Sequence, residues 1–314
     1  MDRQAAAEAL KRIASNVEVV ILGKRSVIET CVLALACEGH VLIEDAPGVG
    51  KTMLAKALAR SIDGVFKRVQ ATPDLLPSDI TGVAVFDQAD REFKFMPGPI
   101  FANVVLVDEV NRTTPRTQSA LLEAMEERQV TAEGATRPVP TPFFVIATQN
   151  PLEYHGTYPL PEGQLDRFIM ATSMGYLAQA DERSVVRSQL LDHPIESLGP
   201  VVTLHEIEEI AACVRETKVT DVVLDYIIGI VAATRTHPDV DLGAGPRGSL
   251  GLTRVAQARA LLVGRDFVAP DDVKAVAAMV LGHRLVLKPQ LRRGPLAGRA
   301  LIRDLLTKLP VSVG

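Results

Sequence analysis

The sequence predicts an α/β fold in which a parallel sheet, covered by helices on both faces, binds a nucleotide and is followed by a small all-helical domain. Three observations predict this fold. A glycine-rich turn at residues 44–52 lies between an apolar run and a helix-forming run. Two more apolar runs, at residues 104–107 and 143–147, end in polar residues, as central parallel strands do. From about Asp181 onward, apolar residues recur at helical spacing only.

The turn EDAPGVGKT has the context of a phosphate-binding loop. A strand that ends in a tight turn aims several backbone N–H groups inward, and the next helix adds the positive end of its dipole. We expect Lys51 to reach the β and γ phosphates of ATP and Thr52 to ligate Mg²⁺. Asp45 departs from the general pattern, which has glycine there, and its carboxylate must point away from a polyphosphate. The predicted nucleotide-binding residues of this loop are Pro47, Gly48, Val49, Gly50, Lys51, Thr52 and Met53.

Two insertions with hairpin signals interrupt the predicted core. Residues 77–97 alternate apolar and polar positions around the polar turn DQADRE, and residues 129–142 resemble a second hairpin that turns at EGAT, residues 133–136. Phe86, Phe93 and Phe95 in the first insertion are either contacts for a partner or packed within the hairpin itself.

The second half of the predicted site is the segment NVVLVDEVNR at residues 103–112. Its four consecutive apolar residues predict a strand buried on both faces, which places Asp108 and Glu109 at the carboxyl end. That end of an open sheet faces the ligand, so we expect Asp108 to bind Mg²⁺ and Glu109 to polarise the attacking water. The alternative is that the two acids cap the next helix. Gln70, at the end of the preceding strand, is a candidate partner of Glu109 in the resting state.

A third strand, FFVIA, ends in the polar segment TQNP. A polar amide at a strand end beside a γ-phosphate can orient the attacking water by hydrogen bonding, which makes Asn150 a candidate catalytic residue. The alternative is a simple turn, since Asn-Pro is a turn signal.

The remaining elements are helices. We predict an α/β core over residues 1–176 and a helical domain over residues 177–314. Apolar residues at helical spacing predict helices near residues 204–214, 222–231, 249–263, 270–281 and 298–309.

Read in order, the phosphate loop, the DE strand and the TQN strand resemble the core of an AAA+ ATPase, in which Asn150 would be the polar residue called sensor 1. The finer pattern resembles one branch of that superfamily, the MoxR family, in which Asp45 is ordinary. The matching stretches cover most of residues 16 to 287. They are EDAPGVGKTMLAKALA, QATPDLLPSDITGVAVFD, FKFMPGPIFANVVLVDEVNR, TPRTQSALLEAMEERQVT, FFVIATQNPLEYHGTYPLPEGQLDRF, HPDVDLGAGPRGSL and GHRLVL.

The resemblance implies roles for two arginines. Arg167, in QLDRF, would be an arginine finger that reaches the nucleotide of a neighbouring subunit; the alternative is a surface pair with Asp166 or Glu162. Arg247, in GAGPRGSL, would be sensor 2, which contacts the γ-phosphate and couples lid closure to the nucleotide state; the alternative is a loop arginine. The resemblance also places adenine near the backbone of residues 20–24, although apolar residues there fit a core equally well.

The resemblance further implies Mg²⁺-dependent ATP hydrolysis between the subunits of a ring, expected to be a hexamer. The ring would act as a chaperone that remodels or matures a client protein complex, together with a protein that carries a von Willebrand factor A domain. In this interpretation ATP and Mg²⁺ are the cofactors. The catalytic residues would be Glu109, Asn150, Arg167 and Arg247, and the metal ligands Thr52 and Asp108.

Two other interpretations stay open from the sequence alone. A magnesium-chelatase subunit or a DNA-processing motor of the same clade would need a porphyrin-synthesising complex or a nucleic acid for turnover. A nucleotide-dependent scaffold would bind ATP to assemble and would hydrolyse little of it. The presence of Glu109 disfavours the scaffold, because a scaffold has no need of an acid that activates water.

Composition predicts a cytoplasmic, soluble enzyme without nucleic-acid binding or membrane insertion. The 314 residues are 47% hydrophobic, enough for two domains with a large core. A net charge of −4 gives no general attraction to nucleic acid. Apolar runs stay well short of the roughly 18 residues that a membrane span needs.

Two groups of residues outside the motifs have ordinary explanations. Three cysteines without metal-type spacing, Cys31, Cys37 and Cys213, predict reduced, buried thiols. Four arginines near the C-terminus, Arg292, Arg293, Arg299 and Arg303, are either a basic patch or, as we expect, a solvated loop and helix face.

Overall fold

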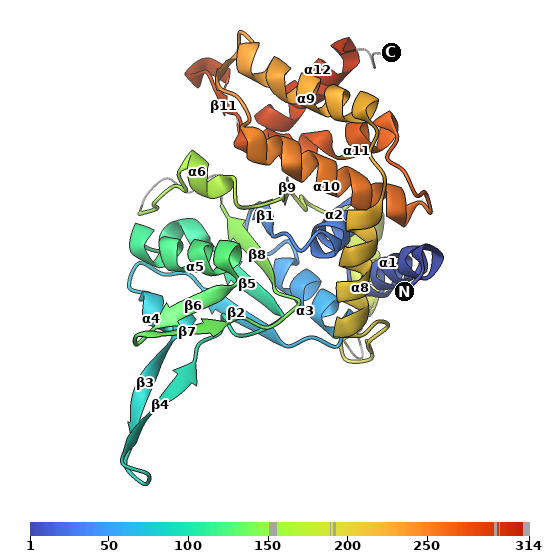
Figure 1. Cartoon of the computed structure of the whole chain (residues 1–314). Helices are drawn as coiled ribbons and strands as arrows, with labels where there is room; N and C mark the ends of the chain where they lie inside the picture. The colour runs from blue at the N-terminus through green and yellow to red at the C-terminus, as the bar shows by residue number, and fades with distance from the viewer. Residues whose placement is uncertain (151–155, 189, 191–192, 292–293, 295, 310–314) are drawn as a thin grey trace.

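A five-stranded parallel sheet lies at the centre of the computed structural model (Figure 1). The structure describes residues 1–314 except 151–155, 189, 191–192, 292–293, 295 and 310–314. The strand order is β2-β5-β8-β1-β9, and every neighbouring pair is parallel, so the carboxyl ends of all five strands meet at one edge. The predicted α/β fold is thus confirmed. The strands are β1 (Val41–Glu44), β2 (Phe66–Gln70), β5 (Val104–Asp108), β8 (Phe144–Gln149) and β9 (Met170–Thr172).

Helices cover both faces of this sheet and form two separate hydrophobic clusters with it. Consecutive residues of β1 alternate between the clusters: Val41 and Ile43 pack in one, and Leu42 in the other. Helices α1, α2 and α3 share the first cluster, and α5 shares the second. The helices of this part are α1 (Arg3–Glu18), α2 (Arg25–Ala36), α3 (Lys51–Ser61), α4 (Pro77–Thr81), α5 (Pro115–Glu127) and α6 (Glu162–Leu165), with a 3₁₀ turn at Val110–Arg112.

Two antiparallel hairpins occupy the two predicted insertions. The β3-β4 hairpin projects from the body of the molecule (Figure 1). The rings of Phe86 and Phe93 lie 5.3 Å apart between centroids, and those of Phe95 and Phe101 lie 5.8 Å apart. These phenylalanines therefore contact aromatic neighbours in the chain, although Phe93 stays 73% exposed. The hairpin strands are β3 (Gly82–Asp87), β4 (Glu92–Pro97), β6 (Gln129–Ala132) and β7 (Ala135–Pro138).

The chain beyond β9 is mostly helical, as predicted, and packs on the N-terminal helices. Helix α8 contacts α1 and α2, and α10 contacts the same two helices, so the first cluster continues into this part. The individual predictions omitted helix α7 (Gln179–Ser188) and an antiparallel pair of very short strands, β10 (Val240–Leu242) and β11 (Val286–Leu287). The helices are α7 (Gln179–Ser188), α8 (Leu204–Glu216), α9 (Asp221–Thr236), α10 (Pro246–Leu262), α11 (Pro270–Leu281) and α12 (Ala297–Lys308), with 3₁₀ turns at Gly282–Arg284 and Pro289–Leu291.

Within the described residues, none of the helices combines the length and the apolar character that crossing a membrane requires.

Two buried histidines predict a pH dependence of stability. His40 donates from Nε2 to the Met125 carbonyl at 3.1 Å and accepts at Nδ1 from the Val145 N–H at 3.0 Å, an arrangement that suits only the neutral ring. Burial lowers the pKa of His40 to about 3 and that of His283 to about 3. In the unfolded chain a histidine takes up a proton near pH 6.5. The unfolded state therefore binds more protons between these pH values, and stability falls as pH falls.

We expect the free energy of unfolding to decrease by about 2 kcal/mol per buried histidine between pH 7 and pH 5. Urea titrations of the wild type at the two pH values measure this loss. His40→Gln should lose about half of the pH dependence, whereas His205→Gln, which changes an exposed histidine, should keep all of it. Equal stability of the wild type at both pH values would contradict the neutral, buried state of these rings.

Candidate active site

The loop between β1 and α3 forms an open cradle at the start of a helix. Gly48 and Gly50 have φ values of +82° and +97°, which side chains other than glycine rarely adopt. A Cβ added to Gly48 would meet no atom within 4 Å, so its backbone borders open space. Helix α3 begins at Lys51, and among the described residues no side chain caps its first N–H groups, which leaves them for an anion. The predicted strand-loop-helix arrangement is confirmed.

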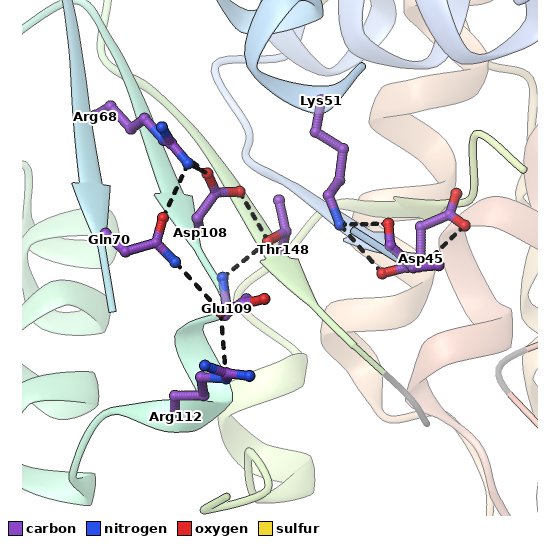
Figure 2. Close-up of polar contacts among 9 residues, drawn as sticks. Asp45, Lys51, Arg68, Gln70, Asp108, Glu109, Arg112 and Thr148 are labelled. Atoms are coloured by element: carbon purple, nitrogen blue, oxygen red, sulfur yellow. Dashed lines mark hydrogen bonds and ion pairs between the residues drawn. The ribbon is translucent and has the colours of Figure 1, made fainter. Parts of the chain in front are cut away.

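Lys51 is held at this loop by backbone carbonyls. Its Nζ donates to the carbonyls of Asp45 and Ala46, both at 3.1 Å, and burial lowers the pKa of its ammonium group (Figure 2). The Asp45 carboxylate points elsewhere, because Oδ2 accepts from the Gly175 N–H at 2.7 Å and from Ser173 Oγ at 3.2 Å. This orientation keeps the negative charge of Asp45 out of the cradle.

Asp108 lies at the carboxyl end of β5, beside the loop, and is 7% exposed. Its Oδ2 forms an ion pair with Arg68 Nη2 at 2.7 Å, and its Oδ1 accepts from Thr148 Oγ1 at 3.2 Å (Figure 2). Both carboxylate oxygens are therefore occupied by donors of neighbouring strands. A cation that binds Asp108 must compete with the Arg68 guanidinium.

Glu109 follows in a left-handed backbone conformation, with φ of 58°, which turns the chain sharply after the strand. Its N–H donates to Thr148 Oγ1 at 2.9 Å. The carboxylate accepts from Gln70 Nε2 at 3.2 Å and pairs with Arg112 Nε at 3.2 Å (Figure 2). The predicted contact between Gln70 and Glu109 is present.

Arg68 is a site residue that the sequence analysis missed. Strand β2 pairs with β5 so that Gln70 lies opposite Asp108, and Arg68, two residues earlier, projects to the same face as Gln70. Arg68 also donates to Gln70 Oε1 at 2.9 Å. The alternation of side chains along β2 can be seen in the sequence and places Arg68 on the same face as Gln70. Only the register between β2 and β5, which the sequence does not show, brings the guanidinium to Asp108.

Two cavities adjoin the cradle and share part of the loop. The smaller, of about 220 Å³, is lined by polar groups of Lys51, Thr52, Asp108 and Glu109 together with Arg68 and Gln70. The larger, of about 320 Å³, is mainly apolar. Pro47, Gly48, Gly50 and Met53 border both cavities, and Val49 borders the larger one. The larger cavity is also lined by Val20, Ile21, Leu22, Met174, Gly175, Tyr176, Leu177 and Val185, and by the charged residues Lys24 and Glu182.

Asn150 follows the end of β8 and is 8% exposed. Because β8 lies between β1 and β5, Asn150 follows the strand that separates the phosphate loop from the two acids. The adjacent Gln149 carbonyl accepts from the Asp45 N–H at 3.1 Å, which ties the end of β8 to the start of the loop. The segment that continues from Asn150, residues 151–155, lies outside the described residues.

Arg167 and Arg247 lie together, around one carboxylate. Arg167 Nε is 3.0 Å from Oε2 of Glu126, and Arg247 Nη2 pairs with Oε1 of the same side chain. Arg167 therefore pairs with neither Asp166 nor Glu162, the two surface partners considered from the sequence. Asp166 pairs with Arg284 instead, at 2.8 Å. Glu126 was not singled out from the sequence.

This arginine pair is separated from the phosphate loop of its own chain. Arg167 and Arg247 line a cavity of about 300 Å³ with Gly39 and His40, which precede β1, whereas the phosphate loop follows β1. Four strand residues span about 13 Å, so the arginines and Lys51 lie at opposite edges of the sheet. The structure thus brings together Lys51, Thr52, Asp108 and Glu109 and places the two arginines elsewhere.

Comparisons with known proteins agree with this geometry. Residues 40–170 match the model of the ATPase family associated with various cellular activities (AAA), and residues 232–305 match that of the AAA lid domain. The chain is 42% identical to the chaperone MoxR1 of Mycobacterium tuberculosis, over 88% of this chain and 76% of that protein. It is 48% identical to the uncharacterized protein YeaC of Bacillus subtilis, over 97% of this chain and 95% of that protein.

Two further relatives point the same way. Protein MoxR of Methylorubrum extorquens is 30% identical over 96% of this chain and 95% of its own length. The crystal structure of a predicted ATPase from Cytophaga hutchinsonii superposes with a TM-score of 0.91 at 36% identity, covering 99% of this chain and 97% of that one. With its phosphate loop, paired acids and helical C-terminal part, the chain belongs to the MoxR family of AAA+ ATPases.

Proposed function

We propose that this chain hydrolyses ATP with Mg²⁺ at the edge of the sheet where Lys51 and Thr52 meet Asp108 and Glu109. The convergence of these four side chains on one cavity carries the proposal. Phosphoryl transfer to water requires groups that bind phosphate, a metal ligand and an acid that polarises the water. The cavity offers an open loop of backbone N–H groups, a lysine held by neutral carbonyls, and two carboxylates.

Each residue has a chemical role in this proposal. Lys51 and the loop N–H groups bind the phosphates, and Glu109 polarises the attacking water once it is released from Gln70. Asn150 helps to orient that water. Thr52 and Asp108 offer the hard oxygen ligands that suit Mg²⁺, and both border the cavity. When bound, Mg²⁺ would neutralise charge on the β and γ phosphates.

The larger cavity suits the base of the nucleotide. It continues from the phosphate loop, and its walls are mainly apolar. Ligand pockets of this kind bind the flat, apolar faces of a base and exclude water from them. Val20, Ile21 and Leu22 line it, which supports an adenine site near residues 20–24.

We further propose that catalysis occurs between the subunits of a ring. The family resemblance implies that this ring is a hexamer. Arg167 and Arg247 lie at the edge of the sheet opposite Lys51, too far to serve the same nucleotide. A neighbouring subunit that presents its phosphate cavity to this edge would receive both arginines. Glu126 would hold the two guanidinium groups until the phosphates of the neighbour replace it.

The name of one relative supports a proposal for how the energy of ATP hydrolysis is used. One relative is named a chaperone, which supports remodelling or maturation of a client protein complex. A partner with a von Willebrand factor A domain fits the family resemblance. The β3-β4 hairpin exposes Val83 and Met96 on one face and Phe86 and Phe93 on the other, and these side chains are candidate contacts with such proteins.

Glu109→Gln tests the proposed reaction. A glutamine keeps the size and the contact with Gln70 but cannot take the proton of the water, so turnover should fall by about 10²- to 10⁴-fold. Affinity for a fluorescent ATP analogue should stay within about threefold, because the phosphate loop is unchanged. The assay measures phosphate release with Mg²⁺ and, as a control, with EDTA.

The matched control is Glu127→Gln, which changes an exposed carboxylate on α5. This variant should behave as the wild type. Turnover of Glu109→Gln equal to that of the wild type would exclude Glu109 as the acid that polarises water, and a wild type that neither binds nor hydrolyses ATP would refute the proposed function.

A further inference from the structure

A buried ion pair joins the C-terminal helix to the base of the phosphate loop. Arg299 on α12 is 5% exposed, and its Nη2 lies 3.2 Å from Oε2 of Glu44, the last residue of β1. Burial raises the pKa of Glu44, and the Arg299 guanidinium opposes that shift. The expectation that this arginine belongs to a solvated face is therefore wrong for Arg299. Arg303, one turn further along the helix, is exposed, and Arg292 and Arg293 lie outside the described residues.

Two glycines fix the position of Arg299. A Cβ on Gly298 would lie 2.1 Å from the carbonyl oxygen of Gly282, and a Cβ on Gly282 would lie 2.9 Å from the Arg299 backbone nitrogen. Such distances leave no room for any larger residue at either position. The first turn of α12 is therefore seated directly on the backbone that follows α11, and Arg299 projects from that contact to Glu44.

Glu44 passes this contact on to the neighbouring strand. Its other oxygen, Oε1, accepts from Gln149 Nε2 at 2.9 Å, and the two residues lie opposite each other in the β1-β8 pair. The Gln149 carbonyl accepts from the Asp45 N–H at 3.1 Å. Glu44 is the last residue of β1, before the phosphate loop, and Gln149 is the last residue of β8, before Asn150. The Glu44 carboxylate therefore links the end of β1, which leads into the phosphate loop, to the end of β8, which leads into Asn150.

We propose that Arg299 is a positioning residue for hydrolysis: through Glu44 and Gln149 it fixes the spacing between the phosphate loop and Asn150. The inference rests on the proposed ATPase function. Its direct consequence is that the position of α12 controls turnover more than nucleotide binding, because the loop N–H groups and Lys51 do not touch Arg299. A ligand or partner that moves α12 would then change the rate without competing with ATP.

Three variants test this role: Arg299→Met, the double variant Glu44→Gln/Arg299→Met, and Arg303→Met as the matched control on the same helix. Arg299→Met leaves the Glu44 charge buried and unpaired, so its melting temperature should fall by roughly 10 °C. Its kcat should fall about 10- to 100-fold at a temperature where it remains folded, because a small displacement of catalytic groups has this effect. Affinity for a fluorescent ATP analogue should change by less than about threefold, since the phosphate loop itself is intact.

The double variant separates positioning from stability. Without either charge, its melting temperature should return close to that of the wild type, whereas kcat should stay low, because α12 is no longer tied to Glu44. Arg303→Met should match the wild type in both measurements. If the double variant recovers kcat together with its melting temperature, or if Arg299→Met keeps wild-type kcat, the positioning role is refuted and the proposed function stands. A wild type and Arg303→Met that both lack turnover would refute the proposed function and this inference with it.

Discussion

Replacing Arg167 by alanine should reduce ATP turnover by roughly 10³-fold or more while nucleotide binding persists, because an arginine supplied in trans stabilises the charge that develops on the γ-phosphate. Arg167 pairs with Glu126 at the edge of the sheet opposite Lys51, so we expect its loss to leave the phosphate loop of its own chain unchanged. Affinity for an ATP analogue and phosphate release, measured on the same preparation, separate the two effects.

A mixing experiment distinguishes action in trans from a structural role. Lys51→Ala lacks the phosphate-loop lysine but keeps Arg167, and Arg167→Ala has the reverse defect. In a randomly mixed ring about a quarter of the interfaces combine an intact loop with an intact arginine, so activity should recover to a comparable fraction of the wild type. Sizing must show that mixed rings form. No recovery in such rings would mean that Arg167 acts within its own subunit or only supports the fold.

Lys51→Ala should have the second large effect. Its Nζ contacts carbonyl oxygens of the loop, where an incoming phosphate would become its stronger partner. Loss of a charge-assisted hydrogen bond of this kind weakens binding about 10- to 100-fold. Turnover should fall further, by about another 10²-fold, because the same charge stabilises the transition state. Calorimetric titration with ATP and the phosphate-release assay measure the two losses.

The fold should survive this change. Burial lowers the pKa of Lys51, so removing the ammonium group relieves a desolvation cost and should leave the melting temperature equal or higher. Lys56→Ala is the matched control, since Lys56 is exposed on the same helix. Near-normal affinity of Lys51→Ala would reject the assignment of this loop as the phosphate site.

Much of this architecture is predictable from the sequence, because the determining signals are local. Strands β5 and β8 have consecutive apolar residues because both of their faces are buried. The loop needs glycine at positions 48 and 50, because its backbone there has a positive φ that other residues rarely adopt. The hairpins follow from alternating residues around polar turns. The short pair β10 and β11 escaped prediction, since two or three residues show no period.

What the sequence does not reveal are contacts between distant segments. Arg68 reaches Asp108 only through the register of β2 on β5. Glu126 meets Arg167 and Arg247 because α5, the turn after α6 and α10 converge in space. For Arg299 the local sequence predicts the wrong environment, because a cluster of arginines is typical of a solvent-exposed surface. Arg299 is instead buried against Glu44, and the close approach of Gly282 and Gly298 makes this possible.

If the active site is shared between subunits, as we propose, the rate of phosphate release per subunit must depend on protein concentration. Phosphate release is measured with saturating ATP and Mg²⁺ over a wide dilution series, and the size of the particle is determined at each concentration. For a shared site we expect a steep rise in rate that coincides with assembly of the ring. A monomer that turns over ATP at the full rate, at a concentration where sizing shows no assembly, would contradict it.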